Sequence, residues 1–443
     1  MVFNLLILVS LLLLLIFSIS KWKIHPFIAL ILTAAVLGIS LGMGGAKTIE
    51  VLLQGFSETI RWIAIVIILG AFIGEVLQET GGAFRIANRV VDTVGLKKLP
   101  WAMGFTGYLI SIPVFVDVAY ILLQPVTESL ASKSKKPVLY IGLALTAGLT
   151  VSHTLIPPTP GPMAVASLLN LDLGKMLLIN MIVAIFAMTG GVLFVINYVQ
   201  NSWLDYDKNL PQSTEIDDIK TKATTQSNNV IFDMLPIIFP ILLIGAGSFL
   251  KFDQTTLTGS FFSFIGLPVV AVFIGALIAI FQLRNNDKRS TINRLVEQSI
   301  VKSALVIMIT GAGGALGFVI KQSGIQNDIL EIFTVYPFLG FMLPFLVAAI
   351  LTTSTGSITV SLVGTASMIA PMVESLPMSP EITAALIGCG SFCVFHANSS
   401  FFWLLNKLHD APPKILYKTY SVQSLVMGFS GLIGVFLLKL LGF

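Results

Sequence analysis

Three ionisable side chains stand out because each lies in an apolar stretch, where a charge is costly. Asp117 follows the run SIPVFV, and His153 and His396 each stand beside a break in apolar sequence. A carboxylate at the centre of a bilayer costs about 2.5 to 3.5 kcal/mol, and imidazole exchanges protons near neutral pH. We therefore expect the three side chains to handle protons beside a polar cavity. A helix-capping role for Asp117 and a packing role for His153 are the structural alternatives.

Two segments add uncharged polar groups that suit a hydroxyl-rich solute. They are TTSTGSIT (residues 352–359) and HANSS (residues 396–400). Isolated Ser and Thr residues often join membrane helices, but a run this dense suggests the lining of a binding site. The candidate substrate-binding residues here are Thr353, Ser354, Thr355, Gly356, Ser357, Thr359, Asn398, Ser399 and Ser400.

Proline-rich breaks mark the corresponding places earlier in the chain, SIPVFVD (residues 111–117) and SHTLIPPTPGP (residues 152–162). Proline removes a backbone donor and breaks helices, so we expect residues 152–162 to be non-helical. Irregular backbone at membrane depth is tolerated where protein buries it or where it lines a cavity. Further candidate binding residues are therefore Pro113, Pro157, Thr159 and Gly161.

The predicted membrane centre holds no Lys or Arg, so an anionic substrate would have to be held by helix N-termini and neutral donors. Cys389, Cys393 and His396 share a helical face but are too few for a metal site. No phosphate-binding GxxxxGK loop is present. We expect no metal, no cofactor and no nucleic-acid partner.

The composition places these residues in a membrane protein. Of 443 residues, 55% are hydrophobic and 11% are charged, against about 25% charged in soluble domains. Residues 2–19, 176–199 and 422–438 lack charge over roughly the 20 residues that a spanning helix needs. No basic residue precedes the first stretch, so we interpret it as a retained span and not a signal peptide. We predict an all-α polytopic membrane protein.

An internal repeat indicates how the breaks are related. At a constant offset of 243 positions, GAFIGEVLQETGG (residues 70–82) aligns with GGALGFVIKQSGI (residues 313–325), and His153 aligns with His396. Many transporters are built from such duplicated halves. We predict a first transmembrane repeat at residues 1–200, a polar cytoplasmic linker at residues 201–230 and a second repeat at residues 231–443.

The basic residues indicate the orientation. If residues 100–130 form a re-entrant hairpin, each half has about five spans, one of them a broken helix, and the odd number makes the second repeat inverted. With the N-terminus outside, most of the 26 Lys and Arg residues fall on the cytoplasmic side, as the positive-inside rule requires. A full span at residues 100–130 would instead place the SKSKK cluster outside.

Several segments resemble the gluconate permease (gluconate:proton symporter) family of the ion-transporter superfamily. They are, in family order, GAFIGEVLQETGGAFRIANRVVDTVG, IPVFVDVAYILLQPV, HTLIPPTPGPMAVASLLNLDLGKMLL, GAGGALGFVIKQSGI, TGSITVSLVGTASMIAP and FHANSSFFWLLNKL. The resemblance implies proton-coupled import of gluconate or a related aldonate across the bacterial inner membrane, and by superfamily analogy a homodimer. Many members have Asn-Asp-Ser where this chain has Asn398, Ser399 and Ser400, which affects the expected substrate. Related members handle glycerate, fructuronate or serine-like substrates.

The leading hypothesis is therefore alternating access with a sugar acid and a proton bound between two hairpin tips. A sodium-coupled carboxylate or dicarboxylate carrier is the alternative within transporters. An intramembrane hydrolase with a Ser/His pair and a channel belong to other classes. Neither a nucleophile elbow nor an HExxH signature supports the hydrolase.

Overall fold

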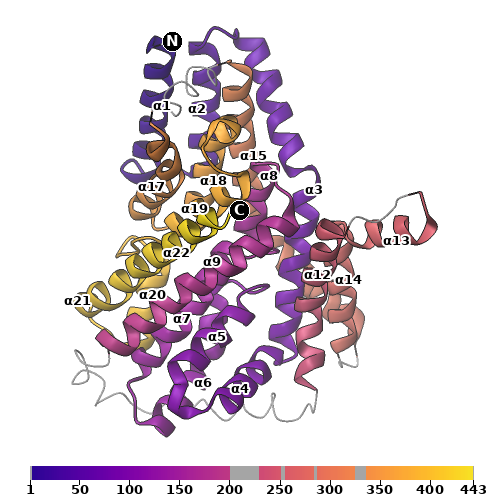
Figure 1. Cartoon of the computed structure of the whole chain (residues 1–443), viewed down its shortest axis with the longest axis vertical. Helices are drawn as coiled ribbons and strands as arrows, with labels where there is room; N and C mark the ends of the chain where they lie inside the picture. The colour runs from indigo at the N-terminus through magenta and orange to yellow at the C-terminus, as the bar shows by residue number, and fades with distance from the viewer. Residues whose placement is uncertain (1, 200–228, 251–254, 284–286, 325–335, 443) are drawn as a thin grey trace.

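The computed structural model describes residues 2–199, 229–250, 255–283, 287–324 and 336–442, and every regular element in these ranges is helical (Figure 1). Within them, eight helical segments are long and apolar enough to cross a membrane. The prediction of an all-α polytopic membrane protein is confirmed. The predicted linker lies outside the described residues except at its end.

The first half contains nine α-helices. They are α1 (Val2–Ser20), α2 (Pro26–Ser40), α3 (Gly45–Glu79), α4 (Gly82–Val94), α5 (Leu99–Ile110), α6 (Val116–Ser134), α7 (Val138–Leu155), α8 (Pro160–Leu168) and α9 (Leu173–Phe194).

The second half follows a similar order in its described residues. Its helices are α12 (Val230–Phe249), α13 (Leu257–Ile265), α14 (Pro268–Gln282), α15 (Lys288–Gln322), α17 (Pro337–Thr355), α18 (Ile358–Ile369), α19 (Pro380–Ser391), α20 (Ser400–His409), α21 (Pro413–Leu416) and α22 (Val422–Leu440). In Figure 1, α13 projects from the side of the molecule.

The two longest described helices, α3 and α15, pack along each other in opposite directions. Gly314 of α15 lies against Gly55 near the start of α3, whereas Arg294 pairs with Glu79 at the end of α3 at 2.9 Å. An ion pair between Lys302 and Glu75 joins the same helices between these points. Glu75 and Glu79 therefore hold the helix pair together at one end.

Helix α3 begins at Gly45, whereas hydropathy predicts a span only at residues 61–78. Its earlier turns contain both polar and apolar residues, and two exposed ion pairs at i, i+3 support this part of the helix: Lys47 with Glu50 and Arg61 with Glu58, each at 3.2 Å. Such pairs stabilise an exposed helix by a few tenths of a kcal/mol. The apolar part of α3 thus continues from a helix already formed.

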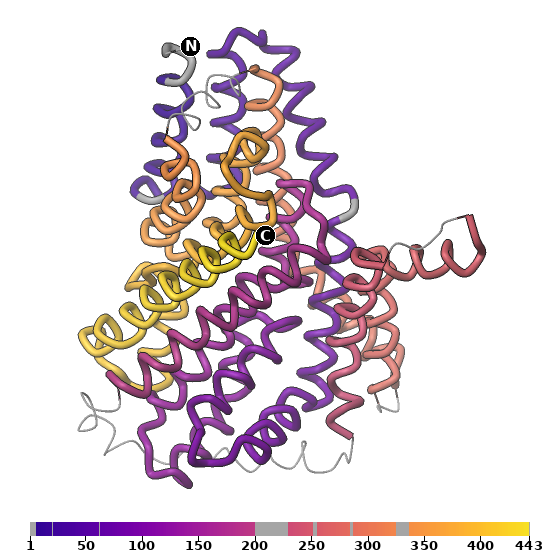
Figure 2. The backbone as a smooth tube through the Cα atoms, viewed as in Figure 1, coloured from indigo at the N-terminus to yellow at the C-terminus, as the bar shows by residue number. Residues whose placement is uncertain are grey.

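The last helices of the two halves, α9 and α22, also pack in opposite directions. Gly190 of α9 lies against Ser430 of α22, and Gly434 of α22 lies against Phe186 of α9. Glycine lets the two backbones approach closely, as is common between membrane helices. Figure 2 shows the two helices side by side across the molecule.

A buried ion pair ties the two halves together at the start of α12. The Arg85 guanidinium of α4 donates to both Asp233 carboxylate oxygens at 2.7 Å and to the Thr80 carbonyl at 2.8 Å. The Asp233 side chain is fully buried and that of Arg85 is 10% exposed. Because burial removes hydration, this bidentate geometry is needed to keep the pair stable.

We expect Asp233→Ala to destabilise the protein strongly, because Arg85 would keep its charge in a buried site. Removing one partner of a buried pair typically costs about 3 to 5 kcal/mol. Thermal unfolding of the detergent-purified protein measures the effect. Glu50→Gln, which breaks an exposed pair, is the matched control and should leave the melting temperature nearly unchanged. Equal melting temperatures for the two variants would contradict this role of Asp233.

Candidate functional site

The first predicted break is a helical hairpin, in which a short turn joins α5 to α6. The Ser111 hydroxyl donates to the Val114 carbonyl at 2.9 Å and closes the turn. Gly74 of α3 lies directly beneath it, because a Cβ at this glycine would overlap the Pro113 carbonyl oxygen. Helix α6 then begins with no side-chain cap and with Asp117 in its first turn.

The second break separates α7 from α8 and is shorter than predicted. We expected residues 152–162 to be non-helical, but α7 continues to Leu155 and α8 starts at Pro160. Proline at the first turn of a helix loses no hydrogen bond, so Pro160 and Pro162 can begin α8. The remaining break, residues 156–159, is buried, and Asn180 donates to the Leu155 carbonyl at 2.8 Å.

The third break is the turn between α17 and α18. Gly356 ends α17 with φ +71°, a left-handed conformation that favours glycine. Ser357 caps α18 by accepting from the Val360 N–H at 3.4 Å. The residues before Gly356, including Thr353 and Thr355, belong to the last turn of α17.

The fourth break, residues 392–399, separates α19 from α20 and holds the neighbouring hairpin in place. His396 Nε2 and Asn398 Nδ2 both donate to the Thr353 carbonyl, each at 2.7 Å. A carbonyl oxygen accepts two hydrogen bonds, so these side chains satisfy it fully. Gly356 is also in close contact with this break, because a Cβ there would lie 2.7 Å from the Ser399 nitrogen.

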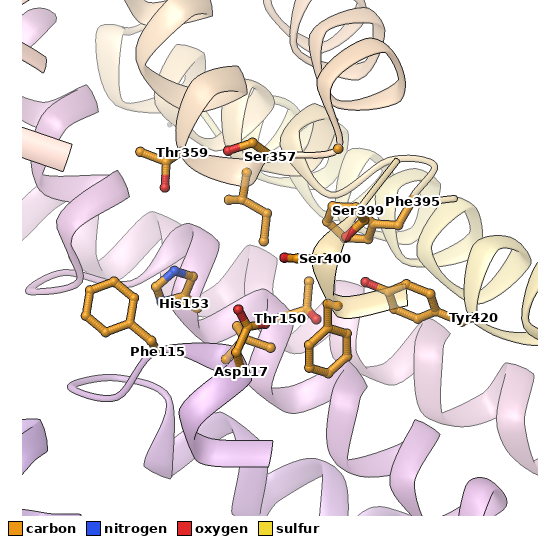
Figure 3. Close-up of a pocket in the computed structure, with 14 residues that line it drawn as sticks. Phe115, Asp117, Thr150, His153, Ser357, Thr359, Phe395, Ser399, Ser400 and Tyr420 are labelled. Carbon is orange, nitrogen blue, oxygen red and sulfur yellow. The ribbon is translucent and has the colours of Figure 1, made fainter. Parts of the chain in front are cut away.

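The hairpin turns, α7 and the fourth break enclose a cavity of about 190 Å³ (Figure 3). This volume is below the roughly 300 to 1,000 Å³ of drug-sized pockets, so it suits a smaller solute. The lining residues are Phe115, Val116, Asp117, Thr150, His153, Gly356, Ser357, Ile358, Thr359, Phe395, Ser399, Ser400, Phe401 and Tyr420.

The cavity offers donors but no basic side chain of lysine or arginine. Helices α6 and α20 both begin at its wall, and neither has a side-chain cap for its first N–H groups. His153 is 8% exposed, and its buried Nδ1 has no hydrogen-bond partner among the described residues. Figure 3 shows the His153 ring and the Asp117 carboxylate directed toward the same space as Ser400. This arrangement can bind an anion and exchange a proton.

Seven of the sixteen predicted site residues line this cavity, and the other nine lie outside its lining. Those in the lining are Asp117, His153, Gly356, Ser357, Thr359, Ser399 and Ser400. Those outside it are Pro113, Pro157, Thr159, Gly161, Thr353, Ser354, Thr355, His396 and Asn398. Among these, Gly161 packs against Leu362, and the Thr355 hydroxyl donates to the Leu351 carbonyl at 2.7 Å.

Seven lining residues were missed by the sequence analysis, namely Phe115, Val116, Thr150, Ile358, Phe395, Phe401 and Tyr420. Thr150 lies three residues before His153, so helical spacing alone could have placed it on the same face. Phe395, Phe401 and Tyr420 form an aromatic wall, with the Phe395 and Tyr420 rings stacked at 5.6 Å. Tyr420 lies in a π-helical turn before α22, and no motif in its segment marked it.

The model of the GntP family permeases matches residues 3–441. The chain belongs to the GntP family. A Gnt-II system L-idonate transporter of Escherichia coli is 30% identical over 94% of this chain and 94% of its own length. A gluconate permease of Pseudomonas aeruginosa is 29% identical over 96% of this chain and 95% of its own length. Because the GntP family consists of permeases, the chain is a membrane transporter and not an enzyme.

A solved structure with little sequence similarity to this GntP family member has the same fold. The YdaH transporter of Alcanivorax borkumensis aligns with a TM-score of 0.67 and 15% identity, covering 94% of this chain and 98% of that chain.

We expect Gly356→Ala to lower the melting temperature, because alanine at this positive φ costs about 1 to 3 kcal/mol and its Cβ meets the backbone of Ser399. Gly245→Ala, in α12, is the matched control. A Cβ there has nothing within 4 Å, so this variant should melt like the wild type or slightly higher. Thermal unfolding of both proteins in detergent tests the prediction. An unchanged melting temperature for Gly356→Ala would mean that the second hairpin turn and the fourth break separate at little cost in stability.

Proposed function

We propose that this protein imports gluconate or a related sugar acid with a proton, by alternating access across the bacterial inner membrane. The observation that carries the proposal is the cavity in which both hairpin turns and the fourth break meet. Discontinuous membrane helices supply free backbone donors for anionic substrates. The gluconate and L-idonate transporters among its relatives support a sugar acid as the solute.

The substrate carboxylate would bind at the start of α20. The first N–H groups of this helix have no side-chain cap, and the helix dipole favours an anion there. Ser399 and Ser400 flank this position, and Ser357 and Thr359 face it from the other hairpin. Hydroxyls on both sides match the hydroxyl groups of a sugar acid.

Asp117 and His153 are the proposed proton-handling pair. Both line the cavity, and neither side chain has an ion-pair partner in the described part of the chain. His396, the third candidate, donates to the Thr353 carbonyl, so we assign it a positioning role. That bond also leaves the carbonyl less available to Na⁺, which favours protons over the sodium-coupled alternative. The location of the N-terminus outside the cell and the homodimer are further proposals for this protein.

Uptake of radiolabelled gluconate into proteoliposomes tests this proposal. We expect an inward proton gradient to drive accumulation in the wild type, and an uncoupler to abolish it. Accumulation that needs sodium and not protons would favour the alternative carrier. If the proteoliposomes take up neither gluconate nor L-idonate, and no binding of either solute or of D-serine is detected, the proposed substrate class is contradicted.

We expect Asp117→Asn to lose proton-driven accumulation by about 100-fold or more, because the amide cannot carry the proton. Asp172→Asn is the matched control. Asp172 caps α9 by accepting from the Gly174 N–H at 2.9 Å, and asparagine is an equally good cap. Unaltered proton-driven accumulation in Asp117→Asn would exclude Asp117 from coupling.

Inverted repeats are the proposed basis of the alternating movement. Helices α3 and α15 each have 35 residues, and their first residues, Gly45 and Lys288, are 243 positions apart. Helices α2 and α14 each have 15 residues. Helix partners that start 242 or 243 positions apart, with α3 and α15 running in opposite directions, support a twofold axis in the membrane plane.

The two halves are not in equivalent positions, which supports movement between two states. Gly74 of α3 lies against the first hairpin turn at Pro113. Its partner in α15, Gly317, lies instead near Ser367 and Ala370, well beyond the second hairpin turn. Exchanging the two arrangements would bring the turn at Gly356 against Gly317 and free Gly74. We propose this exchanged arrangement as the opposite-facing state.

A pair of substitutions tests the exchange. A Cβ at Gly317 would lie 3.5 Å from the Ser367 carbonyl, so Gly317→Ala fits the present state but should block the exchanged one. Gly74→Ala would overlap Pro113 and should favour the exchanged state. Thr359→Cys, in a protein that lacks Cys389 and Cys393, reports which side of the membrane reaches the cavity. We expect impermeant thiol reagents to label this cysteine from one side in Gly317→Ala and from the opposite side in Gly74→Ala. Labelling from the same side in both would contradict the exchange.

A further inference from the structure

We infer that Tyr120 and His409 form a proton relay from the cavity toward the end of α20, an inference that rests on the proposed proton symport. The Tyr120 hydroxyl lies 2.6 Å from His409 Nε2. Both side chains are buried, Tyr120 completely and His409 at 1% exposure. The pair lies outside the cavity lining, and the substrate-binding proposal does not use it.

The pair is connected to the cavity through α6 and α20. Asp117 and Tyr120 are three residues apart on α6, so they share a face of the helix. The Tyr120 ring packs edge-on against Phe401, which lines the cavity, with centroids 5.3 Å apart. A proton leaving Asp117 therefore has a polar partner on the same helix face, one turn further from the cavity.

The route continues toward the predicted cytoplasmic side. Helix α20 starts at the cavity wall and ends at His409, followed by the exposed Asp410. Helical side chains lean toward the helix N-terminus, so the His409 ring leans back to meet Tyr120. Lys407, in the last turn of α20, belongs to the basic residues that predict the cytoplasmic face.

The chemistry of the pair permits a relay that leaves Tyr120 unchanged and leaves His409 as its other neutral tautomer. A phenol hydroxyl can accept one proton while it donates another. Tyr120 would donate its proton to His409 Nε2 and regain one from the Asp117 carboxylic acid through water. His409 would then release a proton from Nδ1 to water at the end of α20, which leaves the other proton on Nε2. The ring would regain the Nδ1–H tautomer by turning or by exchange with water before the next cycle. Histidine suits this step because its charge changes near physiological pH.

The surroundings hold the pair in place and add one acidic group. Gly142 of α7 lies against the hydrogen bond, because a Cβ there would be 3.3 Å from His409 Nε2. Glu128 lies eight residues after Tyr120 on α6 and accepts a hydrogen bond from Gln124 at 3.0 Å. The relay thus joins α6, α7 and α20, from both halves of the chain.

Comparing two transport modes separates a relay from a packing contact. Accumulation driven by a proton gradient requires release of the proton inside the vesicle at each turn. Counterflow, the exchange of external labelled gluconate for internal unlabelled gluconate at equal pH, proceeds with the proton bound throughout. A residue needed only for release affects the first mode and spares the second.

We expect His409→Gln to reduce gradient-driven accumulation about tenfold or more while counterflow stays within about twofold of the wild type. Glutamine keeps a hydrogen bond to Tyr120 but cannot shuttle a proton. Tyr120→Phe keeps the packing against Phe401 and should show the same division. His25→Gln, at the exposed start of α2, is the matched histidine control and should change neither mode.

Each outcome is decisive. Gradient-driven accumulation by the wild type is the control that supports the proposed function. If the wild type accumulates gluconate and both variants accumulate it equally well, the relay is overturned. Parallel loss of accumulation and counterflow would overturn it as well, and would show that the pair only maintains the fold. A wild type with no proton-driven uptake would instead refute the proposed function.

Discussion

The architecture depends on one constraint: a backbone polar group inside a membrane must find its hydrogen bond within the protein or in a water-filled cavity. The chain breaks its helices at four places in apolar sequence, and each break needs such partners. The break before Pro160 is buried in protein, with Asn180 donating to the Leu155 carbonyl. The two hairpin turns and the break before α20 meet at the cavity instead. The demand for hydrogen bonds therefore determines where a binding site can form.

Glycine and small polar residues let these breaks fit together. Gly74 allows the turn at Pro113 to rest on α3, and Gly356 allows the second hairpin to contact the backbone of Ser399. His396 and Asn398 then fix the end of α17 through a single carbonyl. These close contacts thus surround a cavity at whose wall α6 and α20 begin without side-chain caps.

The sequence predicted where the helices break around the site better than it predicted which residues contact one another there. Proline and glycine patterns located both hairpin turns, and the fixed offset between His153 and His396 located the two further breaks. Proline position was misjudged in one respect, since Pro160 and Pro162 begin a helix. Tyr420 and the Arg85–Asp233 pair could not be found in this way, because their partners are distant in sequence and are brought together by packing alone.

The absence of lysine and arginine from the cavity lining has an energetic consequence for a cell with a membrane voltage. A fixed cation would move with the protein in one half-cycle and return in the other, so the voltage would act on the rate of each half-cycle, by up to about 2.3 kcal/mol per 100 mV for a charge that crosses the full field. With helix dipoles holding a monovalent anion and one acid carrying one proton, the charges of the two solutes cancel over a full cycle. Under the proposed symport of one proton with one monovalent sugar acid, transport is electroneutral, so the pH difference alone, and not the voltage, would set how far the solute can be concentrated.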